Sequence, residues 1–135
     1  MRKDVKLFVH QLKQSIEDSY KAYHYVQSME RLTDDPLWNA FIQHIYEDEK
    51  SHYEMFQQLH YMMVGEFVQN PNKDLPCYQL KEGAKQALLI KLECIERYKL
   101  LLLTIPIQEA HEPLYIAFHD GLEHAIRLST IYNGC

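Results

Sequence analysis

The sequence predicts an all-α fold, a four-helix bundle with one long crossover between the second and third helices. Apolar residues recur at helical spacing over four long segments, and Gly and Pro number only 4 and 5 among 135 residues. A long irregular stretch separates the second segment from the third. A chain of this length can bury one core, so we expect a single domain that spans residues 1–135.

The first two helices have recognisable ends in the sequence. The first is expected to end near Met29. The second is expected to begin at Pro36, because capping residues at 33–35 precede a proline at a first-turn position. Gly65 is its expected end. The expected inner stripes are Val5, Val9, Leu12, Ile16, Ser19, Tyr23 and Val26 in the first helix, and Trp38, Phe41, Ile45, Glu49, His52, Phe56, Leu59 and Met63 in the second.

The connection that follows is long enough to cross the bundle. Breakers at Gly65, in the Asn-Pro-Asn at 70–72 and at Pro76 keep the chain irregular to about Gln79. Roughly 15 residues can extend over about 50 Å, and a helix of about 26 residues is roughly 39 Å long. The second and third helices can therefore run parallel.

The third and fourth helices form the second half of the bundle. The third is expected over about Leu80 to Thr104, and the fourth from Pro113 at the latest to Asn133–Gly134. The expected inner stripes are Leu89, Leu92, Glu96, Leu100 and Leu103 in the third helix, with Glu93 beside them, and Leu114, Ala117, Gly121, His124, Leu128 and Ile131 in the fourth. The polar residues in these stripes are the candidates for chemistry.

Charge and composition exclude several classes of partner. The net charge is -5 and no basic stripe is visible, which argues against nucleic acid or an anionic membrane. The longest apolar run, Leu100 to Leu103, is far too short to span a bilayer. The N-terminus lacks the apolar stretch of a secretory signal. Three cysteines without a C-x-x-C pair indicate a reducing compartment, so we expect a cytoplasmic protein.

Two five-residue stretches repeat each other and carry the candidate site. Residues 48–52 read Asp-Glu-Lys-Ser-His, whereas residues 120–124 read Asp-Gly-Leu-Glu-His, with Gly in place of the first Glu. Residues three apart share a helix face, so Glu49 and His52 can bind one ion. Such a Glu-x-x-His occurs in the two-metal carboxylate sites of four-helix bundles. A buried Glu49 needs compensation, either by a metal ion or by a His or Tyr of another helix.

The other two candidate positions lie on the third and fourth helices. His124 is either a ligand, as the repeat indicates, or a hydrogen-bonded core histidine. Glu96 lies on the expected apolar face of the third helix, with Glu93 as the fallback. The alternative for this carboxylate is an ion pair with a neighbouring Arg, a Lys or a core His. Together with Glu49 and His52, these residues form a mixed set suited to Zn or Fe.

These sequence motifs resemble those of the ferritin-like superfamily, in particular of its small rubrerythrin-like members. Residues 18–23, Asp-Ser-Tyr-Lys-Ala-Tyr, are similar to a phrase of its odd helices with Ser for Glu, and residues 48–52 match its Asp-Glu-x-x-His phrase. The resemblance implies six ligand positions: Ser19, Glu49, His52, Glu96 (or Glu93), Gly121 and His124. Because Ser and Gly supply no useful ligand, the resemblance implies the bundle without an intact di-iron centre.

Two functions follow as the main hypotheses, and a third, an iron-storage cage subunit, is set behind them because nothing in the sequence indicates cage assembly. The first is a ferritin-like bundle with a single-metal site for Fe or Zn, or a vestigial one, and a structural or interaction role. A homodimer is then the expected assembly, formed through a second apolar face that includes Leu101 and Leu102. The alternative is a di-iron oxidase or peroxidase of rubrerythrin-like type, in which Asp18, Asp120 and Glu93 replace the missing carboxylates.

Overall fold

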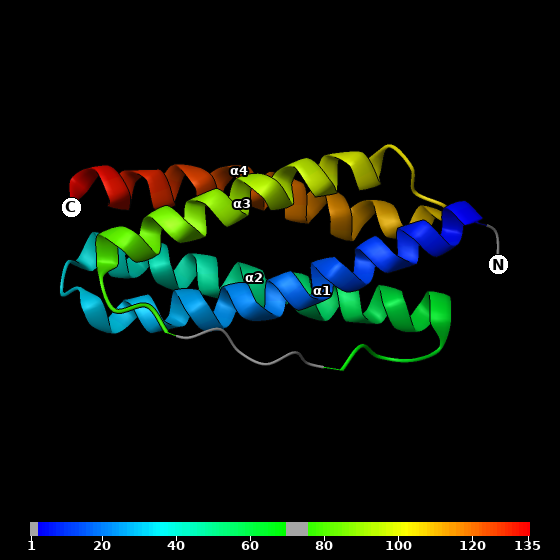
Figure 1. Ribbon diagram of the computed structural model, residues 1–135, viewed down its shortest axis with the longest axis horizontal. Helices are drawn as coiled ribbons and strands as arrows, with labels where there is room; N and C mark the ends of the chain where they lie inside the picture. The colour runs from blue at the N-terminus through cyan, green and yellow to red at the C-terminus, as the bar shows by residue number, and fades with distance from the viewer. Residues whose placement is uncertain (1–2, 70–75) are drawn as a thin grey trace.

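The computed structural model describes residues 3–69 and 76–135, which form four long helices and two short 3-10 turns. The elements in chain order are α1 (Lys3–Met29), η1 (Glu30–Leu32), α2 (Pro36–Val64), α3 (Leu80–Leu102), η2 (Gln108–Ala110) and α4 (His111–Gly134). The helices lie side by side, and α2 and α3 run in the same direction (Figure 1). The predicted all-α bundle with its crossover is therefore confirmed. Across these residues, no helix combines the length and the apolar character that a bilayer span requires.

The ends of α2 confirm the signals in the sequence. The Asp35 carboxylate accepts hydrogen bonds from the backbone N–H groups of Leu37 (2.8 Å) and Trp38 (3.1 Å), which satisfies donors that the first turn leaves unpaired. Gly65 ends the helix with a φ of 88° and donates to the Tyr61 carbonyl at 2.8 Å. This left-handed conformation favours glycine. The predicted breakers at 70–72 lie outside the described residues.

A polar layer divides the core into two apolar clusters. α1 packs mainly against α2, and α3 against α4. One cluster includes Leu12, Phe56 and Leu114, and the other includes Met29, Ile45 and Leu128. Between these levels lie the buried polar side chains Ser19, Glu49, His52, Lys91 and His124. The inner stripe predicted for the fourth helix is buried throughout. The stripes predicted for the first two helices agree with the core over most of their length, but their members nearest the ends, such as Val5, Trp38 and Met63, are only half-buried.

The prediction for the inner face of α3 is wrong. The residues that face the core are Gly83, Ala84, Lys91, Cys94, Ile95, Tyr98 and Leu101. The predicted stripe lies outside instead, with side chains between 47% and 75% exposed at Leu89, Leu92, Leu100 and Leu103. Leucines are frequent all around this helix, so hydrophobicity alone chose the wrong helical phase. Leu101, expected on an outer face, is fully buried in the core.

Candidate functional site

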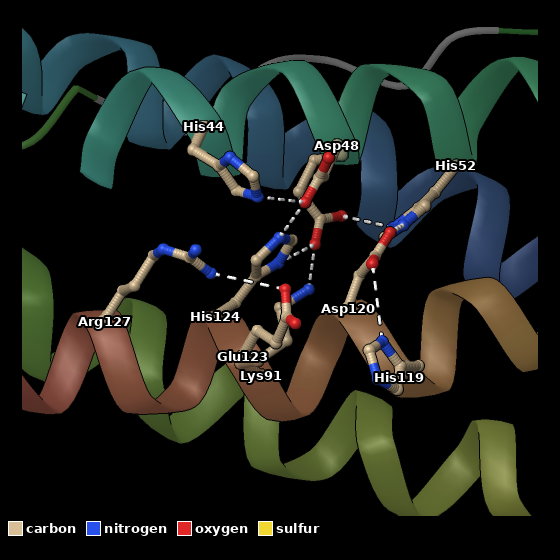
Figure 2. Close-up of polar contacts among 10 residues, drawn as sticks. His44, Asp48, His52, Lys91, His119, Asp120, Glu123, His124 and Arg127 are labelled. Carbon is tan, nitrogen blue, oxygen red and sulfur yellow. Dashed lines mark hydrogen bonds and ion pairs between the residues drawn. The ribbon is translucent and has the colours of Figure 1, made fainter. Parts of the chain in front are cut away.

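The centre of the bundle is a cluster of ionisable side chains drawn from three helices. Glu49 and His52 come from one turn of α2, Lys91 from α3 and His124 from α4. None of these residues exposes more than 5% of its surface. Figure 2 shows the residues from α2 and α4 pointing toward each other across the gap between the helices, with Lys91 approaching from α3. Such burial makes every unpaired charge costly.

Glu49 and Lys91 form a buried ion pair at the heart of this cluster. The Lys91 ammonium donates to Glu49 Oε1. Burial would raise the pKa of Glu49, but Lys91 and the two neighbouring histidines hold it well below its usual range. Burial would likewise lower the pKa of Lys91, and Glu49 raises it instead. Both side chains are therefore charged in the folded protein, and each depends on the other.

The two repeated segments face each other, and their Asp and His residues pair crosswise. Asp48 Oδ2 lies 2.9 Å from His124 Nε2, and Asp120 Oδ2 lies 2.8 Å from His52 Nε2. The other ring nitrogens face Glu49: His124 Nδ1 is 3.2 Å from Oε1, and His52 Nδ1 is 3.8 Å from Oε2. The last distance is too long for a hydrogen bond. Each aspartate thus orients the histidine of the opposite helix.

This network shifts the charge states of its members. Burial would lower the pKa of His52, but the hydrogen bond to Asp120 and the nearby Glu49 carboxylate raise it to about 9. Burial would raise the pKa of Asp48, yet its hydrogen bond to His124 and the charge of that ring lower it. His44 Nε2 adds a contact of 3.1 Å to Asp48. The centre is therefore a network of alternating acidic and basic groups.

The residues at this centre do not fit a two-metal site. A divalent ion about 4 Å from the Lys91 ammonium would be repelled by about 8 kcal/mol at an effective dielectric constant of about 20. Ser19 and Gly121 supply no carboxylate. A Cβ atom at Gly121 would lie 2.9 Å from Ile95 Cγ1 and 3.6 Å from Lys91 Cδ. The side chains of α3 therefore fill the space that a longer residue at this position would need.

Two orphaned atoms remain beside the ion pair. Within the described residues, Glu49 Oε2 and His52 Nδ1 have no hydrogen-bond partner. They face each other at 3.8 Å, so an ion could approach both of them. His124, however, does not supply a third ligand at this place. Glu49, His52 and His124 do not form a group whose donor atoms all lie within 4.8 Å of one another.

A second group of possible ligands lies at the surface of α4. In the described part of the chain, one group of three metal-binding residue types has its ligand atoms within 4.8 Å of one another. It consists of His119, Asp120 and Glu123. His119 is exposed, and the Asp120 carboxylate already pairs with His52. Exposed clusters of this kind are common without a metal. This surface group therefore supplies no metal ligand to the buried centre.

The structure brings together three of the five predicted ligands. Glu49, His52 and His124 meet at the centre. Glu96 and its fallback Glu93 are exposed, so the prediction that one of them supplies a carboxylate at the buried centre is wrong; Glu93 instead lines a space between α1 and α3. The helical phase that carries them outward carries Lys91 inward.

Sequence reasoning missed Lys91 and the crosswise pairing. A signal for Lys91 existed: it lies seven residues after Ala84 and seven before Tyr98, and both of these are buried. It interrupts the apolar run of residues 87–92, where a lysine on the outer face would have been the ordinary interpretation. The repeated Asp-to-His spacing was visible, but only the packing of α2 on α4 shows which Asp meets which His.

Comparisons with known proteins reveal a likeness in structure alone. No protein-family model matches the chain, and no curated protein matches its sequence. A ferritin-like, diiron-carboxylate protein from Bacillus anthracis str. Ames is 17% identical, with a TM-score of 0.83 over 98% of this chain and 99% of that one. A dodecameric thioferritin, the bacterioferritin-related protein from Bacteroides fragilis, is 15% identical, with a TM-score of 0.81 over 96% of this chain and 86% of that one. The chain therefore has the ferritin-like four-helix-bundle fold.

Proposed function

We propose that this protein is a ferritin-like bundle with a vestigial metal centre, in which a fixed ammonium group takes the place of the metal. The observation that carries the proposal is the buried ion pair between Lys91 and Glu49. A lysine cation compensates the carboxylate that a metal ion would otherwise compensate. Because an ammonium group has no accessible redox chemistry, the role is structural or binding, without oxygen activation.

A single-metal site is the second candidate. It is favoured by the facing pair of orphaned atoms, Glu49 Oε2 and His52 Nδ1. An Fe or Zn ion there would have these two atoms as its protein ligands and would still meet the Lys91 ammonium. The di-iron oxidase or peroxidase hypothesis is less well supported, because Glu93 is exposed and Asp18 and Asp120 are engaged with Arg97 and His52.

Metal analysis of the purified protein tests the first proposal. After growth with added iron and zinc, we expect substoichiometric metal by mass spectrometry. Addition of Zn²⁺ or of a chelator should leave the melting temperature unchanged, because only a ligand that binds the folded state shifts it. A full metal ion per chain, with a melting temperature that falls on chelation, would instead establish a metal site.

A charge reversal at Lys91 tests whether the ammonium is what excludes metal. Lys91→Glu places a second carboxylate beside Glu49, His52 and His124, so the variant should bind Zn²⁺ and gain stability from it. At a free concentration of 100 times Kd the gain is about 2.7 kcal/mol. Lys85→Glu, on the exposed side of the same helix, is the matched control and should gain nothing. If wild type and Lys91→Glu bind Zn²⁺ equally well, the ammonium does not exclude the metal.

The homodimer stays a prediction, but the surface expected to form it differs from the one that the sequence indicated. The outer leucines of α3, Leu89, Leu92, Leu100 and Leu103, replace the buried Leu101 as the exposed apolar face. We expect light scattering to give the molar mass of a dimer, and Leu92→Lys with Leu100→Lys to shift it to a monomer without loss of helical content. An unchanged mass in this double variant would assign the contact to another surface.

The cytoplasmic location also stays a proposal. It is supported by the free thiols, since Cys77 and Cys94 are buried without a disulfide and Cys135 is exposed. Unpaired cysteines are typical of a reducing compartment. Fractionation of cells that produce the protein from its own gene would test it.

A further inference from the structure

A cavity of about 500 Å³ opens between α1 and α3 and reaches the centre of the bundle. Its apolar walls include Ala22 and Val26 of α1, together with Ala87 and Ile90 of α3. Ile45 of α2 and Leu128 of α4 close its inner side. The volume falls within the range of small-molecule sites, about 300–1,000 Å³.

Small side chains keep this space open. Ser19 and Ala22 line it from α1, and Ala87 and Cys94 line it from α3. The described contacts between α1 and α3 are also sparser than those within the α1–α2 and α3–α4 pairs. Larger side chains at these four positions would close the gap. The cavity is therefore a property of the local sequence.

The deep end of the cavity carries hydrogen-bonding groups that the protein leaves incompletely used. The Ser19 side chain is 1% exposed and lines the cavity, and among the described residues its Oγ atom has no hydrogen-bond partner. The hydroxyls of Ser19 and Tyr98 are close enough for Ser19 to oppose the rise that burial gives the pKa of Tyr98, but the two groups do not meet at normal hydrogen-bond geometry. An ammonium group has three N–H donors. The described hydrogen bond of Lys91 uses one of them, to Glu49, so the others are available to a ligand.

The charges around the cavity are already balanced. Lys91 is neutralised by Glu49 at the deep end, and Arg97 pairs with Asp18. Lys21 of α1 and Glu93 of α3 also line the cavity and carry opposite charges, so the charged side chains that line it sum to zero. A carboxylate ligand at the deep end would lie next to Glu49, where the lining cation Lys91 is already paired, and a buried unpaired charge is costly. The cavity therefore suits an uncharged group that can use the donors at its deep end.

We propose that this cavity binds an uncharged, mainly apolar molecule that carries a single alcohol or carbonyl oxygen. The oxygen accepts hydrogen bonds from Ser19 and Lys91, and the apolar part lies between α1 and α3. The inference rests on the proposed metal-free centre, because a metal ion beside Glu49 would change the donors that the ligand meets. It assigns a binding role to a site that otherwise only stabilises the bundle.

Titration of the protein with 1-octanol tests this proposal, and sodium octanoate, a charged molecule with the same chain length, is the control. Calorimetry and amide NMR shifts should show saturable binding of 1-octanol, with the shifted amides on α1 and α3. Octanoate should bind at least about tenfold more weakly, because its carboxylate would be buried at the deep end beside Glu49, where Lys91 is already paired. Equal affinity for the two probes would overturn the neutral-ligand assignment.

Two variants locate the site. Ser19→Ala removes one hydrogen bond and should weaken 1-octanol binding by about five- to tenfold. It should leave the unfolding midpoint in urea unchanged or higher, since it also removes an unpaired buried hydroxyl. Ala22→Phe fills the cavity and should abolish binding, whereas Ala40→Phe, on an exposed part of α2, should bind like wild type. Binding that survives both Ser19→Ala and Ala22→Phe would overturn the site.

Metal analysis of the same samples separates this inference from the proposed function. A metal-free protein that fails to bind 1-octanol would overturn only the ligand site. A full metal ion per chain would overturn the proposed function and the donor arrangement on which the inference rests. A metal-free protein with saturable 1-octanol binding that Ser19→Ala weakens would support both.

Discussion

Replacing Lys91 by methionine should destabilise the protein by about 3–5 kcal/mol, because it leaves the Glu49 carboxylate buried without its counter-charge. This is a large share of the 5–15 kcal/mol that typically stabilises a domain. The unfolding free energy from urea denaturation at neutral pH measures it. Methionine keeps the length and most of the volume of the lysine side chain, so the loss reports mainly on charge.

Two controls assign this loss to the ion pair. Lys85→Met removes an exposed lysine of the same helix and should change stability by no more than about 0.5 kcal/mol. The double variant Glu49→Gln with Lys91→Met removes both charges and should recover most of the loss, since neutral replacement of a buried pair costs little. A double variant that is as unstable as Lys91→Met alone would show that packing, and not the pair, accounts for the effect.

Stability should fall as the pH rises from about 6.5 to 9, because His52 loses its proton over this range in the folded protein. Its pKa rises from 6.5 to about 9 on folding, a difference of about 2.5 units, or about 3 kcal/mol at 1.36 kcal/mol per unit. The folded state holds this proton more tightly, so the contribution is complete below pH 6.5 and is lost as the pH passes 9. Urea denaturation at a series of pH values measures the decline.

Asp120→Asn is the matched control for this pH dependence. Asp120 accepts the hydrogen bond from His52 Nε2 at 2.8 Å, and it is the largest of the influences that raise the pKa of this ring. The variant should therefore lose stability near pH 6 and show a shallower decline toward pH 9. A wild-type stability that stays level or rises between pH 6.5 and 9 would contradict the charge state assigned to His52.

The sequence alone determined the bundle and one side of the site. Apolar spacing in α1, α2 and α4, the cap at Asp35 and the end at Gly65 are local signals, so they could be read without tertiary contacts. The paired placement of Glu49 and His52 follows from helix geometry, because residues three apart share a face. Ser19 and Gly121, at positions where the ferritin-like resemblance implies carboxylates, already indicated a reduced centre.

Only the tertiary structure decided what occupies that centre. α3 carries leucines on several sides, so its phase is set by packing against α1 and α4 and not by hydrophobicity. This packing turns Glu93 and Glu96 outward and places Lys91 against Glu49. A buried lysine is stable only where a carboxylate from another helix meets it, and such a contact between distant residues leaves no periodic signal in the sequence. The interpretation as a metal site or an internal ion pair therefore depended on the three-dimensional arrangement.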